Sequence, residues 1–286
     1  MISTRFDALK MVLDEPIESY SSLSGGCVSD VYKIDFSSSP SLVVKVAATE
    51  SIESLRIEGL SLEYLRENTP VEVPKVIYND DGILLMEYVV NDSIMTAAAE
   101  RNCALRFAEL HQCSNRGFGF DFDTVIGGLA QPNPTCSSWL DFYSEFRILH
   151  MAIMARDAGN LDSKDFRRIE GLVNRLDNWL TEPSSPALVH GDAWSGNVLV
   201  KNDALAAVID PACYYGDAEV DLAFSTMFGT FSNHFFERYD SLNPIREGFF
   251  EERKDLYLIY PILVHIRLFG GSYTPHLHRV LMRYGF

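Results

Sequence analysis

The stretch LVHGDAWSGNVLV, residues 188–200, decides the fold class of this chain. Both ends of the stretch are apolar, as is typical of short buried strands, and between them lie His190, Asp192 and Asn197 with two glycines. Polar side chains gathered on a short loop between buried strands indicate a loop that performs chemistry on a rigid support. The loop is therefore the first candidate for a catalytic site.

The spacing of the polar residues points to phosphoryl transfer. Four residues separate Asp192 from Asn197, and Asp210 ends the next apolar segment, LAAVID. In enzymes of the protein-kinase type, a loop Asp accepts the proton of the attacking hydroxyl, and an Asn and a second Asp hold Mg²⁺. We predict Asp192 as the base and Asn197 and Asp210 as the metal ligands. The alternative, in which Asp192 and Asn197 only shape a turn, fits either residue alone better than the ordered set.

The periodicity of the whole chain predicts two unequal lobes. Before residue 90, strand patterns surround a double glycine, recur at 41–47 and 75–89, and enclose one helical pattern at 49–68. The rest is mostly helical, apart from strands within 188–209 and an insert at 118–135 that we expect to be irregular. We predict an α+β fold of the bilobal protein-kinase-like type. Residues 1–89 form a small, β-rich nucleotide-binding lobe with one main helix, and residues 90–286 form a larger, mostly helical catalytic and substrate-binding lobe.

Lys45 is the candidate phosphate anchor. It lies in the middle of the apolar strand LVVKVA, where burial of a lone ammonium group would be costly. A kinase gives such a lysine two anionic partners, the nucleotide phosphates and a helix carboxylate. We favour Glu58, beside Gly59 in the middle of the 49–68 helix, over Glu53 and Glu63. The alternative is a surface lysine on an edge strand.

Two weaker patterns complete the predicted nucleotide site. Gly25 and Gly26 precede Lys45 and would let backbone N–H groups approach phosphate oxygens, although any hairpin can carry two glycines. The segment LLMEYV would form the hinge between the lobes, with the backbone of Glu87 and Tyr88 pairing with adenine. A plain buried strand would show the same pattern.

Composition restricts the class of partner. The net charge of −16 opposes binding to a polyanion, so we expect no nucleic-acid partner. The most apolar late stretch, LYLIYPILVHIRLF, is interrupted by Pro261, His265 and Arg267 and falls short of the ~20 apolar residues of a membrane span. The N-terminus lacks the apolar run of a signal peptide, and the five cysteines contain no CxxC pair. We expect a cytoplasmic protein with no membrane contact.

With these residues in view, the chain resembles the fructosamine kinase (ketosamine kinase) family, within the wider aminoglycoside-phosphotransferase and protein-kinase-like group. The resemblance covers nearly the whole chain. Its most specific marks are WSGN in the loop, DPACYYGDAEVDLAF at 210–224 and the insert GFGFDFDTVIGGLAQPNPTCSSWLDFYSEFRI at 117–148. Two positions depart from the family pattern: Ala193 replaces a bulkier aliphatic residue, and Ala218 replaces a frequent Arg, which removes a cation near the site.

The resemblance implies a deglycating kinase. ATP with Mg²⁺ would phosphorylate the 3-hydroxyl of a ketosamine, either a small molecule or a glycated protein, and the product would then lose phosphate and free the amine. Trp194 would line the sugar site, and Gln131 and Asn133 of the insert would lie there too. One of the residues Asp217, Glu219 and Asp221 is implied to face the substrate amine or the catalytic loop, with Asp217 and Asp221 as the candidates for the substrate side. For Asp221 a purely structural, bracing role is equally favoured.

The resemblance also implies a regulatory residue. A cysteine at the position of Cys27, in the glycine turn, is implied to form a redox-sensitive disulfide between two chains, so the protein would be a monomer or a redox-linked homodimer. The alternative is a small residue that the turn tolerates.

Two other functions compete with a ketosamine kinase. One is a different small-molecule phosphotransferase, acting on an aminoglycoside, choline or a thiosugar, against which the insert argues. The other is a non-catalytic kinase-like binding protein, against which the joint presence of Lys45, Asp192, Asn197 and Asp210 argues. The sequence leaves open which sugar the substrate carries and whether its amine is free or part of a protein.

Overall fold

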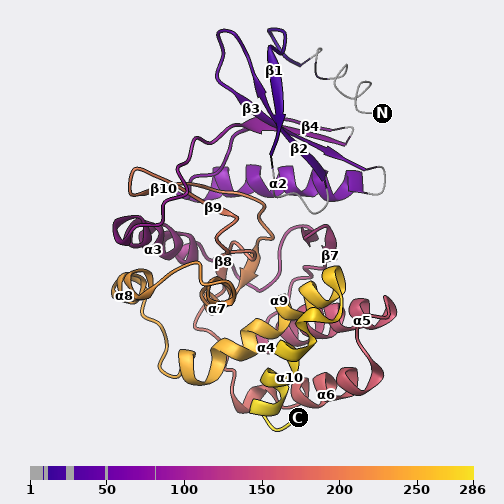
Figure 1. Ribbon diagram of the computed structural model, residues 1–286. Helices are drawn as coiled ribbons and strands as arrows, with labels where there is room; N and C mark the ends of the chain where they lie inside the picture. The colour runs from indigo at the N-terminus through magenta and orange to yellow at the C-terminus, as the bar shows by residue number, and fades with distance from the viewer. Residues whose placement is uncertain (1–8, 10–11, 24–28, 49–50, 81) are drawn as a thin grey trace.

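The chain folds into a small sheet-containing lobe above a larger helical lobe (Figure 1). The computed structural model describes residues 9, 12–23, 29–48, 51–80 and 82–286. The arrangement confirms the predicted bilobal α+β class. The predicted boundary between residues 89 and 90 stays a prediction.

The upper lobe is built on one antiparallel sheet of five strands in the order β1-β2-β3-β5-β4. The strands are β1 Ser19–Ser22, β2 Ser29–Asp35, β3 Leu42–Ala47, β4 Val76–Asp80 and β5 Ile83–Glu87, and the helix that packs on them is α2 Ile52–Asn68. Lys45 lies in the central strand β3, opposite Val31 of β2 and Leu84 of β5. The alternative of a surface lysine on an edge strand is therefore excluded.

Helix α2 approaches the sheet closely at one glycine. A Cβ atom on Gly59 would lie 2.2 Å from the side-chain nitrogen of Asn79 in β4, so a larger residue would displace the Asn79 amide, which donates to the Arg56 carbonyl of α2 at 2.9 Å. The apolar face of α2, with Leu55, Leu62 and Leu65 buried, holds the helix against the core. This close approach fixes the position of the neighbouring Glu58 relative to β3.

The lower lobe consists of helices around short two-stranded sheets. Its elements are α3 Ala97–Gln112, β6 Thr124–Ile126, β7 Leu129–Gln131, α4 Trp139–Tyr143, η2 Ser144–Leu149, α5 His150–Asp157, α6 Ser163–Val173, η3 Leu176–Asn178, β8 Ala187–Val189, β9 Val198–Lys201, β10 Ala204–Val208, β11 Tyr214–Gly216, α7 Glu219–Met227, α8 Asn233–Leu242, η4 Phe249–Arg253, α9 Lys254–Phe269, η5 Gly271–Tyr273 and α10 Thr274–Arg283. Helix α9 has ten buried residues, and it packs against α5, α7 and α10. The core of this lobe therefore surrounds α9.

The insert at 118–135 differs from the prediction. Instead of an irregular segment, it contains the hairpin β6–β7, in which Ile126 pairs with Leu129 across a two-residue turn. The turn residues Gly127 and Gly128 have φ of 54° and 77°, the left-handed conformation that such tight hairpins require. The prediction was wrong because three-residue strands are too short to produce a recognisable alternation of apolar and polar residues.

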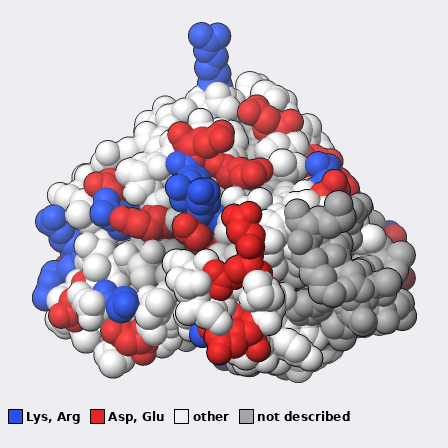
Figure 2. Space-filling view, turned by 90° about the horizontal axis from the view of Figure 1, so that it is seen from above, with Lys and Arg blue, Asp and Glu red and all other residues white. Residues whose placement is uncertain are grey.

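The surface of the upper lobe carries both signs of charge. On the face seen from above, acidic side chains predominate and basic side chains lie among them (Figure 2), as the net charge of −16 leads one to expect. Within the described ranges, no helix combines the length and the apolar character that crossing a bilayer demands.

Candidate active site

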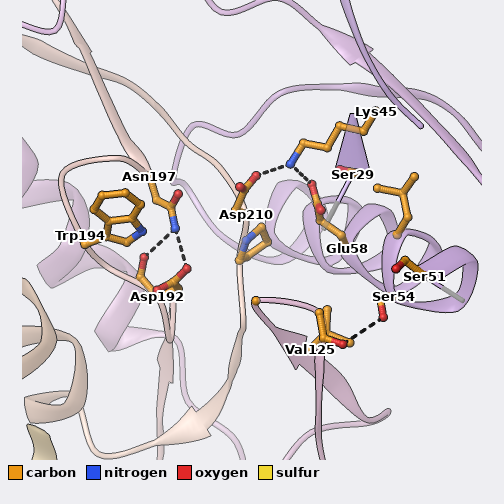
Figure 3. A pocket seen from close by; sticks show the side chains of 14 residues that line it. Ser29, Lys45, Ser51, Ser54, Glu58, Val125, Asp192, Trp194, Asn197 and Asp210 are labelled. Atoms are coloured by element: carbon orange, nitrogen blue, oxygen red, sulfur yellow. Dashed lines mark hydrogen bonds and ion pairs between the residues drawn. The ribbon is translucent and has the colours of Figure 1, made fainter. Parts of the chain in front are cut away.

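The catalytic-loop candidate, residues 190–197, connects β8 to β9 and is closed by its own hydrogen bonds. The Asn197 side-chain amide donates to the Asp192 backbone oxygen at 3.0 Å and to the Asp192 carboxylate at 2.8 Å. The Asn197 backbone N–H donates to the Trp194 carbonyl at 2.9 Å. These bonds orient Asp192 and Asn197 toward the space that Asp210 also faces (Figure 3). The three predicted loop and metal residues thus lie around one cavity.

A glycine makes the sharp entry to this loop possible. Gly191 has φ of 81°, and a Cβ atom there would lie 2.2 Å from the carbonyl oxygen of Ala212. The next residue toward the C-terminus is Asp192, so any adjustment at Gly191 moves the candidate base directly. The Gly of HGD is therefore required both by its backbone conformation and by the lack of space beside it.

We expect Gly191→Ala to lower both the stability of the fold and the rate of turnover far more than the matched change Gly159→Ala. Gly159 has φ of 77° and nothing within 4 Å of its Cβ position, so Gly159→Ala pays only the cost of a left-handed alanine, about 1–2 kcal/mol. Gly191→Ala adds a collision with rigid backbone, worth about 1–3 kcal/mol more, and displaces Asp192. Thermal unfolding and ATP turnover measure the two effects, and equal losses in both variants would contradict this account.

Asp221, at the start of α7, holds the catalytic loop in place through hydrogen bonds to its backbone. Its two carboxylate oxygens accept the backbone N–H groups of His190 at 2.7 Å and Gly191 at 2.8 Å. His111 Nε2 lies 3.0 Å from the same carboxylate, and His111 Nδ1 lies 2.6 Å from the Tyr239 hydroxyl. Asp221 is 1% exposed, and all these partners belong to the protein. Of the two alternatives considered for Asp221, these contacts favour bracing the loop over facing the substrate.

Lys45 joins the two lobes through a pair of carboxylates. Its Nζ lies 2.6 Å from Glu58 of α2 and 2.5 Å from Asp210 of the lower lobe. Glu53 instead pairs with Arg56, and Glu63 is exposed. Burial alone would lower the pKa of Lys45, but the charges of Glu58 and Asp210 outweigh it and raise the pKa above its usual value, so Lys45 stays charged.

Asp192 has the electrostatic environment of a base. Burial, followed by the negative charge of Asp210, raises the pKa of Asp192 to about 8, although the hydrogen bond from Asn197 acts in the opposite direction. A raised pKa makes the ionised carboxylate a stronger proton acceptor than an ordinary aspartate. The adjacent His190 is buried, and its burial lowers its pKa, so His190 is a neutral structural neighbour.

The cavity between the lobes collects these residues. Lys45, Glu58, Asp192, Trp194, Asn197 and Asp210 line it, together with Ser29, Ser51, Ser54, Leu55, Val125, Gly127, Gly128 and Pro211. The hairpin β6–β7 forms one wall, and its Gly128 carbonyl accepts a hydrogen bond from Ser54 of α2 at 3.3 Å. This contact joins the insert to α2, the helix that carries Glu58. It was not predicted from the sequence.

Three residues predicted at the substrate site lie in the core, with protein partners. The Gln131 amide bonds to Thr124, Ala212 and the Tyr260 hydroxyl. Asn133 bonds to Thr124, to the Phe122 carbonyl and to the buried Arg147. Asp217 accepts from Tyr257 at 2.7 Å and from Arg246. Because they are only 0–3% exposed, these three side chains are closed to a substrate and instead stabilise the segments that surround the site.

Arginines from another segment neutralise the acidic residues on both sides of Ala218. Ala218 lies between Asp217 and Glu219, and Arg246 contacts both of these carboxylates. Arg253 also contacts Glu219, at 2.7 Å. The guanidinium groups therefore neutralise the acidic pair on either side of Ala218. Ala193, the other departure, is buried within the loop.

The remaining predicted residues concern the nucleotide. The backbone N–H of Glu87 donates to the Lys75 carbonyl at 3.0 Å, and that of Tyr88 donates to the Ser41 carbonyl at 3.3 Å. Neither amide is therefore available as a donor to adenine in this conformation, because the two bonds extend the pairing of β5 with its neighbours β4 and β3. Gly25, Gly26 and Cys27 lie outside the described residues.

A group of aromatic residues beside Asp192 was missed by sequence reasoning. Phe228, His265, Phe269 and Tyr273 line a second cavity together with Asp192 and Trp194. His265 and Phe269 are four residues apart on α9, a spacing that places them on one face of the helix. That spacing was visible in the sequence, but nothing in it indicated that the face points toward the catalytic loop.

Comparison with known proteins gives a consistent result. The sequence matches the family described as fructosamine kinase over residues 1–284. A probable ketoamine kinase of Synechocystis sp. is 33% identical over 272 residues, covering 93% of this chain and 90% of the relative. A chloroplastic protein-ribulosamine 3-kinase of Arabidopsis thaliana is 31% identical over 275 residues, covering 92% of this chain and 81% of the relative.

Solved structures agree with these sequence relatives. A candidate fructosamine-3-kinase from Thermobifida fusca superposes with a TM-score of 0.85 at 30% identity, covering 97% of this chain and 98% of that chain. The aminoglycoside phosphotransferase APH(4)-Ia, solved with AMP-PNP and hygromycin B, superposes with a TM-score of 0.70 at 14% identity, covering 97% and 98%. The second likeness concerns the fold alone, and it confirms the predicted kinase-like architecture.

Proposed function

The chain belongs to the fructosamine kinase family, and from this premise we propose that it transfers the γ-phosphate of ATP to the 3-hydroxyl of a ketosamine. Family membership implies a kinase that uses ATP and acts on a hydroxyl group. The relatives named ketoamine kinase and protein-ribulosamine 3-kinase support the acceptor class. The observation that carries the proposal is the meeting of Asp192, Asn197 and Asp210 with the Lys45–Glu58 pair in one cavity.

Asp192 is the proposed base. Its carboxylate accepts the proton of the acceptor hydroxyl as the hydroxyl oxygen forms a bond to the γ-phosphorus, and the bond from that phosphorus to the β,γ-bridging oxygen breaks to release ADP. The two hydrogen bonds from Asn197 hold the carboxylate in place during this transfer. Positioning of this kind contributes most of the catalysis in phosphoryl transfer, because the reaction needs little covalent chemistry from the protein.

Lys45 is the proposed phosphate anchor. The ammonium group is charged and bonded to Glu58 and Asp210, so it keeps one N–H donor for a nucleotide phosphate entering the cavity. On this proposal residues 1–89 bind the nucleotide and residues 90–286 supply the base and the acceptor site. Adenine then pairs with backbone groups of the connection between the lobes other than the N–H groups of Glu87 and Tyr88, which are already bonded.

The donor set fits Mg²⁺. Asn197 uses its amide nitrogen for Asp192, which leaves its side-chain oxygen for a cation, and Asp210 uses one carboxylate oxygen for Lys45 and keeps the other. The described residues contain no cluster of three His, Cys, Asp or Glu side chains that could hold a metal by itself, so the protein would supply these two oxygens alone. Two protein oxygens completed by phosphate oxygens and water are typical of Mg²⁺ in kinases. When bound, the ion would neutralise charge on the phosphates.

We expect Asp210→Asn to raise the Mg²⁺ concentration required for half-maximal turnover by about tenfold or more, because it removes a charged ligand. Titration of MgCl₂ at fixed concentrations of ATP and of the ketosamine measures this value. The control is Asp157→Asn, whose carboxylate is 61% exposed and pairs with its neighbour Arg156. An unchanged Mg²⁺ requirement in Asp210→Asn would remove Asp210 from the proposed metal site.

The chemistry of the proposed product accounts for release of the amine from the sugar, which is the proposed repair reaction. A phosphate on O3 lies next to the C2 carbonyl, so enolisation toward C1 allows the C3–O bond to break with loss of inorganic phosphate. Hydrolysis of what remains then frees the amine. The enzyme needs only to place the phosphate, since the carbonyl of the substrate supplies the electronic path for the elimination.

The experiment that tests the proposed function compares acceptors. ATP consumption with Mg²⁺ is measured on ribulosamines, fructosamines and erythrulosamines of one small amine, beside hygromycin B and choline. Turnover on at least one ketosamine, with none on the other two acceptors, is the expected result. Turnover on an aminoglycoside or choline alone would favour the competing phosphotransferase, and ATP binding without turnover on any acceptor would favour a non-catalytic binding protein.

A redox-linked dimer through Cys27 stays a separate prediction. Cys27 lies outside the described residues, and the four described cysteines are free thiols. Non-reducing gel electrophoresis after peroxide treatment tests it: a monomer band in the wild-type protein would contradict it.

A further inference from the structure

A second cavity, of about 280 Å³, shares Gly127, Asp192 and Trp194 with the cavity between the lobes. Its other walls come from the end of α7, from the second half of α9 and from η5. A space of this size is near the lower end of the range for small-ligand sites. Asp192 therefore lies where the cavity between the lobes and this second cavity meet, as the base of a two-substrate reaction should.

The walls of the second cavity are aromatic. Trp194 packs edge-to-face on Phe228 with ring centroids 5.8 Å apart, and Phe228 contacts His265 at 5.3 Å. His265 in turn lies 4.8 Å from Tyr273 and 5.6 Å from Phe269. The rings thus form a continuous chain that starts at the catalytic loop and ends at the rim of the cavity.

Two of these rings are unusually exposed for their size. Phe228 is 41% exposed and Phe269 is 51% exposed, although both contact other rings of the cavity. Large aromatic side chains left half open beside a catalytic residue are typical of sites that a ligand covers. A ligand with apolar surface would gain from removing these rings from water.

The cavity offers little to an anionic group. Among the described residues that line it, Asp192 carries the sole formal charge. His265 donates its Nδ1–H to the Pro261 carbonyl at 2.7 Å, and burial lowers its pKa, so the ring is neutral near pH 7. A carboxylate or a sulfonate on a ligand would therefore lose water without gaining a cationic partner.

The geometry of a ketosamine assigns this cavity to one part of the substrate. With O3 at Asp192, the amine nitrogen is four covalent bonds away, through C3, C2 and C1. A nitrogen at that distance can reach Trp194, which lines both cavities beside Asp192 and whose face attracts a protonated amine. The substituent on the nitrogen continues away from Asp192, toward Phe228, His265, Phe269 and Tyr273.

We propose that this aromatic cavity binds the substituent on the ketosamine nitrogen and selects uncharged, apolar and above all aromatic substituents. This inference rests on the proposed function, because it deepens the acceptor side of the same site. Phe269 and Tyr273 are the specificity-determining residues, since they form the wall farthest along the ring chain from Trp194. Small amines with a carboxylate next to the nitrogen are the disfavoured class.

The test uses three ketosamines of one sugar, made from benzylamine, from glycine and from ethylenediamine. The wild-type enzyme should have a kcat/KM for the benzylamine compound about tenfold or more above that for the glycine compound. In Phe269→Ala this ratio should fall about tenfold. The matched control is Phe250→Ala, because Phe250 is 44% exposed, contacts two other rings and lies outside the cavity. It should leave the ratio unchanged.

Calorimetric binding of the same three compounds in the absence of ATP separates this inference from the proposed reaction. Preferential binding of the benzylamine compound, weakened in Phe269→Ala, supports the aromatic cavity even if no compound is phosphorylated, in which case the proposed reaction fails alone. Phosphorylation of all three with equal kcat/KM overturns the cavity assignment and leaves the reaction standing. Preference for the ethylenediamine compound also overturns it, in favour of a cation-binding aromatic site.

Discussion

Replacing Asp192 by Ala should lower kcat for ketosamine phosphorylation by about 10²–10⁴-fold, the usual contribution of a positioned general base. The loss is expected in kcat, because Asp192 acts on the proton of the attacking hydroxyl and the Lys45–Glu58 pair that anchors phosphates is left in place. Steady-state kinetics with Mg²⁺ and a ketosamine measure kcat, and calorimetry with a non-hydrolysable ATP analogue measures nucleotide binding.

The control for this variant is Asp157→Ala, which removes an exposed carboxylate far along the chain on α5. It should leave kcat unchanged. A fall of less than about tenfold in Asp192→Ala, with normal nucleotide binding, would show that the carboxylate is not the base. The raised pKa of Asp192 would then reflect only its burial and the negative charge of Asp210.

Asp221→Asn should combine a loss of stability with a loss of activity. Each carboxylate oxygen accepts a backbone N–H of the catalytic loop, from His190 or Gly191, so the amide nitrogen of Asn must face a donor in either orientation. We expect the free energy of unfolding to fall by about 2–4 kcal/mol, since a buried donor loses a charged acceptor. Displacement of the loop should lower kcat by about 10²-fold.

The matched control is Asp165→Asn on α6. Asp165 is also buried, at 4% exposure, and also pairs with a histidine, His278 at 2.6 Å, but it lies far from the loop. Chemical denaturation should show that both variants are destabilised, whereas kcat should fall in Asp221→Asn alone. Equal kcat values in the two variants would mean that Asp221 stabilises the fold without positioning the catalytic loop.

The sequence predicted the parts of this protein that rest on local patterns. Lys45 in an apolar strand indicated an anionic partner, and Glu58 is the helix carboxylate that reaches it. The loop at 190–197 was located because its flanking strands and its ordered Asp and Asn are contiguous in the chain. In each case the residues that define the feature are close in sequence or follow a regular period.

The features that sequence reasoning missed depend on long-range packing. Gln131 and Asp217 looked like substrate ligands because they are polar and lie in family-specific segments, but their partners, Tyr260 and Tyr257, come from α9. The aromatic cavity combines residues from the catalytic loop, α7, α9 and η5, and no spacing in the sequence brings them together. The brace from Asp221 was only one of two alternatives until its two backbone donors were placed.

The most direct test of the central claim is the position of the transferred phosphate. A ribulosamine labelled with ¹³C at C3 is incubated with the enzyme, ATP and Mg²⁺ and followed by ¹³C and ³¹P NMR. The account predicts a phosphorus coupling on the C3 resonance, followed by release of inorganic phosphate and free amine, with neither signal in Asp192→Ala. Phosphate coupled to a different carbon, or ATP hydrolysed while the ribulosamine stays unchanged, would contradict it.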